Sequence, residues 1–447
     1  MSAVFSPTAS QEKDRRAMRI FLLIAALAAS AAAPVAIKAS YRADFERYYT
    51  AASTALRGGD IYERRDDRQF KYLPVFALFL TPLAIFCETA LPADKNEEIP
   101  TSAQLMLAAG VWYALAALAY AATVFLAVSL CRPANCRLNL WILSMAIAFS
   151  GRFFWDNLRL GQVNILAMFF ACLAIAMVYR QRPTAAGICA AVAAVLKHMP
   201  ALLLLWFLLR RQWRAAGGFA AALAALVFVA PMLVWGPSGG MNLLGKWVES
   251  RHKMVTDLPA DHAPGQSIPA MINRLLRRTN AAPLRDKQPI YINIAAWPSA
   301  AVRAAAAAAV AIALALAAAV LWRSGGKPEN AALEAGLLFL LMLLISPESR
   351  KAHFVSVLIP AAALTSVFLS WRHRWLGLCL ASAFALLALS SEGVIGRGAL
   401  YQYFHAYGGL MWGAVLLAIG CGVALCAKSS AMPQLRKMSW DKSAPAA

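Results

Sequence analysis

The chain alternates long apolar segments with short polar ones over most of its length. Segments such as residues 103–130 and 300–322 reach the roughly 20 residues that a helix needs to cross about 30 Å of hydrocarbon. None has the alternating pattern of a transmembrane β-strand, so the pattern predicts an all-α polytopic integral membrane protein. We expect a bundle of about 10 to 13 membrane helices in a single transmembrane domain, residues 1–447, with apolar segments at residues 18–37, 72–87, 103–130, 138–150, 162–179, 185–209, 215–235, 300–322, 332–346, 354–370, 375–390 and 408–427.

The composition agrees with a protein that is solvated mainly by lipid. Hydrophobic residues make up 61% of the chain and charged residues 15%, with a mean hydropathy of +0.58. A net charge of +21 would suggest nucleic acid in a soluble protein, but here Lys and Arg flank the apolar segments, as the positive-inside rule describes. We therefore expect a multi-pass protein of the cell (inner) membrane without a nucleic-acid partner.

Basic residues also predict the orientation of the segments. The arginines that follow residues 209, 322 and 371, and the basic tail at 428–447, belong in the cytoplasm. Simple alternation would leave the arginines after residues 131 and 179 outside. Two irregular segments can correct this: residues 72–87 are short, and residues 185–209 are broken at Lys197-His198-Met199-Pro200. Each half of the broken segment is about 18 Å long, so we expect a re-entrant or tilted pair that raises Lys197 toward the outer face.

Two long polar stretches are then external, residues 38–71 and residues 236–299. The first directly follows the first span and is expected to carry a catalytic loop with a juxtamembrane helix. In the second, apolar residues recur at helical spacing with arginines on other faces, which predicts a helix on the membrane surface. That apolar face consists of Ile268, Met271, Ile272, Leu275 and Leu276.

Asp44 opens a helical pattern in the first of these stretches. One face carries aromatic residues, and Gly58-Gly59 ends the pattern. The spacing leaves two interpretations of the carboxylate open. It is either a helix N-cap, although Arg47 stands where a capping box would have Glu or Gln, or a general base at the water–membrane boundary. Beside such a base, Arg42 and Arg47 would bind an anion, as a phosphate-bearing substrate would supply.

Other polar residues interrupt apolar surroundings. Lys197 lies within an apolar run, where an ionisable group is costly and therefore a functional candidate, although it could also snorkel. Arg350 and Lys351 fall on the expected outer side, where the positive-inside rule predicts few cations, and this favours a bound anion. A further cluster is either a solvated loop or a set of hydrogen-bonding contacts to a sugar or head group, and it includes Asn157, Arg159, Gln162 and Asn164. No metal-ligand spacing is present among the cysteines and histidines.

These residues resemble motifs of the polyprenyl-phosphate-dependent glycosyltransferases of the GT-C class, and within it glycosyltransferase family 87, which includes α-mannosyltransferases. The similar stretches span roughly residues 40–355, and their order is more specific than any one of them. They are Asp44-Phe45 to Tyr49, Gly58-Gly59-Asp60-Ile61-Tyr62, Phe70-Lys71-Tyr72-Leu73-Pro74, Gly161-Gln162-Val163-Asn164, Leu196-Lys197 with Pro200, Gln266-Ser267, and Ser346-Pro347 with His353.

The resemblance implies a GT-C-type bundle and an inverting transfer in which Asp44 deprotonates an acceptor hydroxyl. Lys197 and His198, and Arg350, Lys351 and His353, would then stabilise the departing lipid phosphate. Relatives more often have a smaller residue at the position of His198. Tyr48 and Gln266 join the polar cluster above as implied contacts to the sugar or the acceptor.

The expected function is an integral membrane glycosyltransferase that moves a sugar, mannose being the first guess, from polyprenyl phosphate to a lipid or glycan acceptor. Its active site would face the periplasm or exterior, with membrane lipid as a partner and with neither a metal nor a separate cofactor. The alternative is a transporter or flippase of lipid-linked sugars, because broken helices and midplane charges also mark substrate pathways.

Overall fold

The computed structural model describes Arg19 and residues 44–63, 69–86, 103–132, 136–256, 265–282 and 288–440. These residues form helices and connecting loops without a strand. Seven of the described helices are long and apolar enough to cross a membrane, and five shorter apolar helices accompany them. The prediction of an all-α polytopic membrane protein is therefore confirmed. The expected first span at 18–37 lies outside the described residues.

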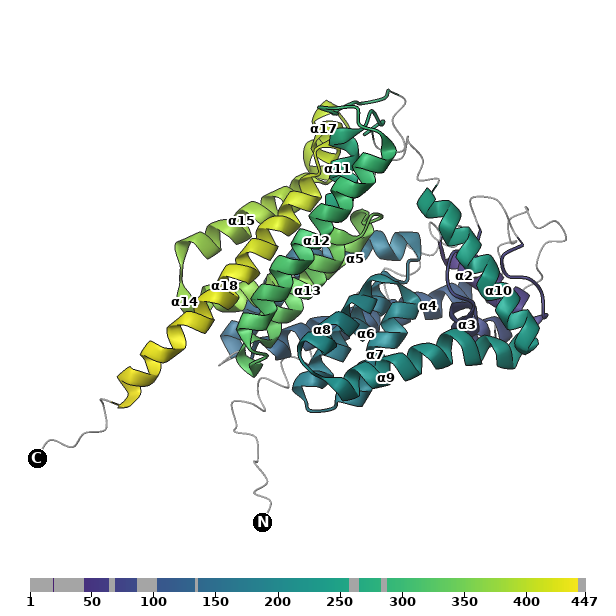
Figure 1. The fold of residues 1–447 in the computed structure, drawn as a ribbon, viewed down its shortest axis with the longest axis horizontal. Helices are drawn as coiled ribbons and strands as arrows, with labels where there is room; N and C mark the ends of the chain where they lie inside the picture. Colours follow the sequence, from purple (N-terminus) through teal and green to yellow (C-terminus); the bar gives the residue numbers. More distant parts are fainter. Residues whose placement is uncertain are drawn as a thin grey trace, which may run out of the picture.

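Figure 1 shows two groups of helices, with α2, α3, α9 and α10 at one end of the molecule and α14, α15 and α18 at the other. The first half of the chain comprises α2 (Asp44–Leu56), α3 (Pro74–Phe86), α4 (Ala103–Cys131), α5 (Cys136–Leu160), α6 (Asn164–Tyr179), α7 (Pro183–Leu196), η1 (Met199–Ala201) and α8 (Leu202–Leu209). The second half comprises α9 (Trp213–Ala224), η2 (Ala225–Val229), α10 (Ala230–Thr256), α11 (Ile268–Leu276), α12 (Ser299–Ser324), η3 (Pro328–Asn330), α13 (Ala331–Ile345), η4 (Lys351–Val357), α14 (Leu358–Trp371), α15 (Arg374–Leu389), α16 (Glu392–Ile395), α17 (Ala399–Ala406) and α18 (Gly409–Trp440).

The segment 185–209 is broken where the sequence predicts it. Helix α7 ends at Leu196, Lys197 adopts an extended conformation, and α8 starts at Leu202. Pro200 explains the interruption, because it has no N–H to donate to the carbonyl of Leu196. At about 1.5 Å per residue, neither α7 nor α8 is long enough to cross the membrane alone.

A buried polar cluster places both arginine-bearing loops on the same side of the molecule. Glu334, at the start of α13, is fully buried and pairs with Arg210 at the end of α8. It also accepts hydrogen bonds from Tyr179 at the end of α6, at 2.9 Å, and from Ser324 at the end of α12, at 2.5 Å. The ends of α6 and α8 therefore lie close together, so α7 and α8 form a hairpin, as the expected re-entrant pair requires.

Helix α3 is also short. Its 13 residues span about 20 Å, which is less than the hydrocarbon thickness. It packs against α2 through Phe76, which contacts the ring of Tyr48 with centroids 4.9 Å apart. The described part of the irregular segment 72–87 is thus too short to cross the membrane alone.

Helix α5 is longer than the apolar segment expected at residues 138–150. The hydropathy pattern ends it at residue 150, but the helix continues to Leu160 and includes the first part of the polar cluster, Asn157 and Arg159. Arg152 donates to the carbonyl oxygens of Leu387 and Ser390, at 3.0 and 2.8 Å, and Asn157 donates to that of Ala352. Asn157 therefore belongs to the last turns of a helix and has a protein partner, so this part of the cluster is not a solvated loop.

The stretch 236–299 is more structured than a loop. Helix α10 continues through it to Thr256 after a kink at Gly236, whose φ of +72° suits glycine. The predicted helix at 268–276 is present as α11, but Arg274 on it is fully buried and donates to the carbonyl of Gly265 at 2.5 Å. Burial lowers the pKa of Arg274 to about 10. This arginine contributes to the protein interior and not to a polar surface face.

Candidate functional site

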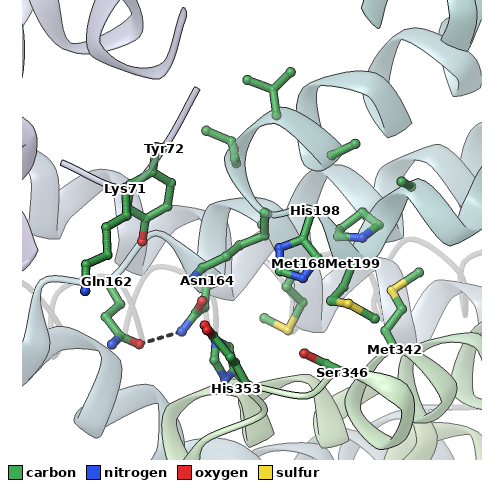
Figure 2. Close-up of a pocket in the computed structure, with 18 of the residues that line it drawn as sticks. Lys71, Tyr72, Gln162, Asn164, Met168, His198, Met199, Met342, Ser346 and His353 are labelled. Carbon is green, nitrogen blue, oxygen red and sulfur yellow. Dashed lines mark hydrogen bonds between the residues drawn. The ribbon is translucent and has the colours of Figure 1, made fainter. Parts of the chain in front are cut away.

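A cavity of about 680 Å³ opens where α2, α7, α13 and η4 come together. Its lining is strongly asymmetric. Figure 2 shows Lys71, Gln162 and Asn164 toward one side and three methionines toward the other, with His198 beside the methionines. The methionines are Met168, Met199 and Met342. The cavity therefore suits a molecule that is charged at one end and apolar at the other.

The position of Asp44 depends on a glycine far along the chain. Gly161, with φ of +61°, lies so close to α2 that an added Cβ would be 2.9 Å from the Cβ of Phe45. Trp112 contacts Phe45 and donates to the Gly161 carbonyl at 3.1 Å. This close approach brings the first turn of α2 against the start of α6, so Asp44 and Gln162 line one cavity.

Asp44 is the first residue of α2 and pairs with Arg47 one turn later, with 2.7 Å between Oδ1 and Nη1. Both side chains are partly exposed, at 20% and 28%. The carboxylate is therefore accessible from the cavity, and the pair can open when another anion binds Arg47. Arg42 lies outside the described residues.

Lys197 and His198 reach the cavity from the break between α7 and η1. Lys197 caps the C-terminus of α7, where the helix dipole favours a cation. Its Nζ lies 5.4 Å from the ring centroid of Tyr72. The break between the two helices thus directs a cation to the cavity.

Arg350 and His353 line the cavity from the start of η4. The backbone N–H of Arg350 donates to Nδ1 of His353 at 2.8 Å. Because Nδ1 is an acceptor in this bond, the neutral ring carries its proton on Nε2 and can donate it to a ligand.

Lys71 is a site residue that the sequence analysis did not select. It lies among charged neighbours and is half-buried. Burial lowers its pKa, and the nearby Arg47 and Arg350 lower it further, while Glu348 and Asp44 act in the opposite direction. Its place in the motif Phe70-Lys71-Tyr72-Leu73-Pro74 was the available signal.

Other lining residues come from regions without a distinctive pattern. Arg251 and Trp247, on the outer part of α10, line the cavity, as does Glu348 after the Ser346-Pro347 motif. Arg251 donates to the carbonyl of Lys71 at 2.6 Å. Nothing in the sequence connects α10 to the loop before α3, so Arg251 and Trp247 could not be selected beforehand, whereas the neighbouring motif was an available signal for Glu348.

Gln162 and Asn164 line the cavity and are joined by a hydrogen bond of 2.6 Å from Asn164 Nδ2 to Gln162 Oε1 (Figure 2). Asn164 Nδ2 also donates to Oδ1 of Asn157 at 2.9 Å. The Gln162 amide therefore directs its N–H groups away from this bond, where they can donate to a ligand. Asn157 is fully buried and positions Asn164.

The remaining predicted contacts lie outside the cavity lining. Tyr48 is fully buried and bonds to the hydroxyl of Tyr72 at 2.9 Å. Lys351 pairs with Asp156 at 3.2 Å, and Gln266 is buried and donates to the carbonyl of His405 at 2.9 Å. Arg159 is exposed at the end of α5. Tyr48 and Gln266 support the site through packing, while Lys351 and Arg159 have no contact with it. Within the described ranges, no group of three or more His, Cys, Asp or Glu side chains could hold a metal ion.

Comparison with solved structures identifies ArnT from Cupriavidus metallidurans, crystallised with undecaprenyl phosphate, as similar. The identity is 13%, the TM-score is 0.37, and the match covers 91% of this chain and 77% of that one. No curated protein matches the chain significantly.

The profile of glycosyltransferase family 87 matches residues 70–347, which is more than half of the chain. The matched region contains most of the cavity lining, including Lys71, Gln162, Lys197 and Arg251, and it ends just before Arg350. The chain belongs to glycosyltransferase family 87.

Proposed function

We propose that this membrane glycosyltransferase moves a sugar from a polyprenyl-phosphate donor to a lipid or glycan acceptor at the outer, periplasmic or exterior, face of the cell membrane. Mannose is the first candidate sugar. The observation that carries the proposal is the cavity lining, which combines Asp44 and several cations with a group of methionines. A lipid-linked sugar phosphate likewise combines a charged part with an apolar part.

In the proposed reaction, Asp44 takes the proton of an acceptor hydroxyl. The oxygen forms a bond to the anomeric carbon from the face opposite the phosphate, and the bond between that carbon and the phosphate oxygen breaks. Configuration is therefore inverted, the polyprenyl phosphate leaves with its electron pair, and Asp44 returns the proton to water. Binding of the donor phosphate to Arg47 would open the Asp44–Arg47 pair and free the base.

The leaving phosphate gains negative charge as the bond breaks, and fixed cations stabilise this charge best where little water competes. Lys71, Lys197 and Arg350 line the cavity for this purpose, and His353 can donate its Nε2 proton. Gln162 is proposed to donate to a sugar hydroxyl. The proposed reaction needs neither a metal nor a separate cofactor, because the phosphate linkage already activates the sugar.

The proposal is tested with purified protein, radiolabelled mannose on polyprenyl phosphate, and an extract of membrane lipids as acceptors. We expect labelled product from the lipid-linked donor, none from nucleotide-linked mannose, and the same rate in the presence of EDTA. Movement of intact donor across vesicles without transfer would instead support a flippase. Transfer from the nucleotide sugar would contradict the proposed donor.

Replacing Lys197 with alanine should lower kcat by about 10²–10³-fold, because a preorganised cation would be lost from the leaving phosphate. The Lys197→Arg variant should recover part of the rate. Lys351→Ala is the control, because Lys351 pairs with Asp156 and does not line the cavity. Equal rates for Lys197→Ala and Lys351→Ala would contradict the role of Lys197.

Lys71 predicts an alkaline limit of activity. Because its pKa is lowered from 10.5, the ammonium should lose its proton, and kcat/KM should fall, at a pH below the ordinary lysine range. In Lys71→Arg this fall should move to higher pH, since a guanidinium stays protonated. The measurement is kcat/KM between about pH 6 and about pH 11, a range that covers the titration of lysine. An unchanged alkaline limb in the arginine variant would exclude Lys71 as its source.

A further inference from the structure

A second cavity, of about 620 Å³, lies between α5, α14 and α15. Its two arginines, Arg137 and Arg372, lie at the ends of α5 and α14 that are farther from the cavity lined by Asp44. Helix α5 begins near Arg137 and ends beside Gly161, and α14 begins after η4 and ends at Arg372. The lining includes Arg137, Trp141, Thr365, Arg372, Ala381 and Phe384.

The cavity is a groove that is closed at one end. Phe149 of α5 and Phe384 of α15 meet edge to face, with ring centroids 5.2 Å apart. Beyond them, Arg152 of α5 donates hydrogen bonds to the carbonyl oxygens of Leu387 and Ser390 at the end of α15. From Phe149 back to Arg137 the helix rises about 18 Å, which is close to the roughly 15 Å of hydrocarbon in one leaflet.

The walls of the groove are apolar and partly uncovered. Trp141 is 53% exposed and Phe384 is 40% exposed, although both line the cavity. A second copy of the chain fits poorly, because a helix about 10 Å across and about 18 Å long occupies roughly 1,400 Å³. A single flexible acyl chain matches the length and the narrow volume of the groove.

The open end of the groove is basic. Arg137 and Arg372 are both exposed there, and neither forms an ion pair with an acidic side chain in the part of the chain that the structure describes. Guanidinium groups bind phosphate oxygens well, and basic pockets between membrane helices bind anionic lipid head groups. Trp141 on the same wall is typical of the membrane interface.

Thr365 provides an independent indication of a ligand. It is only 3% exposed, it lines the groove, and its hydroxyl has no hydrogen-bond partner among the described residues. A buried hydroxyl without a partner is costly. The ester carbonyl of a glycerophospholipid can accept a hydrogen bond from this hydroxyl, whereas a plain hydrocarbon chain has no acceptor.

We propose that this groove binds one anionic glycerophospholipid of the membrane. An acyl chain lies between α5, α14 and α15, and the phosphate is held by Arg137 and Arg372. The site is separate from the catalytic cavity and does not depend on the proposed donor.

The test is native mass spectrometry of the full-length protein, delipidated and then exposed to phosphatidylglycerol or phosphatidylcholine in mixed micelles. We expect phosphatidylglycerol to bind with at least about tenfold preference, because its head group has a net negative charge, whereas the choline of phosphatidylcholine offsets the charge of the phosphate. The double variant Arg137→Gln/Arg372→Gln should lose this preference. Arg374→Gln is the matched control, because Arg374 is exposed nearby but does not line the groove.

A second pair of variants tests the groove itself. Ala381→Phe places a ring in the cavity and should reduce binding of phosphatidylglycerol, whereas Ala385→Phe, one turn further along α15 and outside the lining, should not. Equal binding of the two lipids to the wild-type protein would overturn the proposal. Retention of phosphatidylglycerol by Ala381→Phe would also overturn the proposal. A change of oligomeric state in that variant would overturn it as well, because it would mean that a second copy of the chain occupies the groove.

Discussion

Asp44→Asn should lower kcat for sugar transfer by about 10²–10⁴-fold, with a smaller effect on KM for the donor. Asparagine keeps the size of the side chain but cannot accept a proton, and general-base catalysis contributes rate enhancements of this order. Donor binding should persist, because the cations of the cavity remain in place. Initial rates with a polyprenyl-phosphate sugar, measured over a range of donor concentrations, separate the two parameters.

Two further variants make this experiment decisive. Asp156→Asn is a matched control, because its side chain is 18% exposed, against 20% for Asp44, and it also pairs with one cation. It does not line the cavity and should retain activity. Glu348 is the other carboxylate in the lining, so Glu348→Gln tests the rival base. Loss of activity in Glu348→Gln, together with an active Asp44→Asn, would transfer the role to Glu348.

Glu334→Ala should destabilise the folded protein by about 3–5 kcal/mol, the typical cost of leaving a buried charge without its partner. Glu334 is fully buried, and the Arg210 side chain beside it is only 10% exposed. The same substitution removes the acceptor of the Tyr179 and Ser324 hydroxyls. Unfolding by SDS in mixed micelles, followed by tryptophan fluorescence, measures the loss.

Tyr179→Phe is the milder comparison for Glu334, because it removes one hydrogen bond and leaves the ion pair. Its cost should be about 1.5–3 kcal/mol. Replacing both charges, as in Arg210→Met/Glu334→Leu, should restore much of the stability lost in Glu334→Ala, since apolar packing can substitute for a buried pair. A stability of Glu334→Ala within about 1 kcal/mol of the wild type would mean that water reaches this cluster.

The sequence predicts best those features that depend on neighbouring residues. The helix at 44–56, its end at Gly58, and the break at Lys197 to Pro200 all follow from local spacing and backbone chemistry, and the structure confirms each of them. The inference that residues 185–209 turn back on themselves also succeeded, because it combined a length limit with the distribution of arginines, whereas their re-entrant place in the membrane stays a prediction.

Features that depend on distant parts of the chain were missed. The polar end of α5 looks like a loop until Ala352, Leu387 and Ser390 provide partners for its side chains. Arg274 looks like a surface residue until the carbonyl of Gly265 is seen beside it. Residue spacing contains no information about such contacts, which arise only when the helices pack.

The candidate site shows the same division. Asp44, Lys197, Arg350 and His353 were selected for their chemistry or their motif, and the structure brings them to one cavity. Arg251 belongs to that cavity only because α10 folds back over the loop before α3. Their roles in transfer remain predictions until the variants above are measured.

The pairing of Arg210 with Glu334 also constrains how the protein is assembled during synthesis. The two residues are 124 positions apart, so at about 5–20 residues per second the arginine waits roughly 6–25 s for its partner to be made. During that interval the α7–α8 hairpin contains two helices too short to insert alone. We therefore expect the hairpin to be held by the insertion machinery, or by a chaperone in the membrane, until α13 arrives, so that Lys197 reaches its place late in biogenesis.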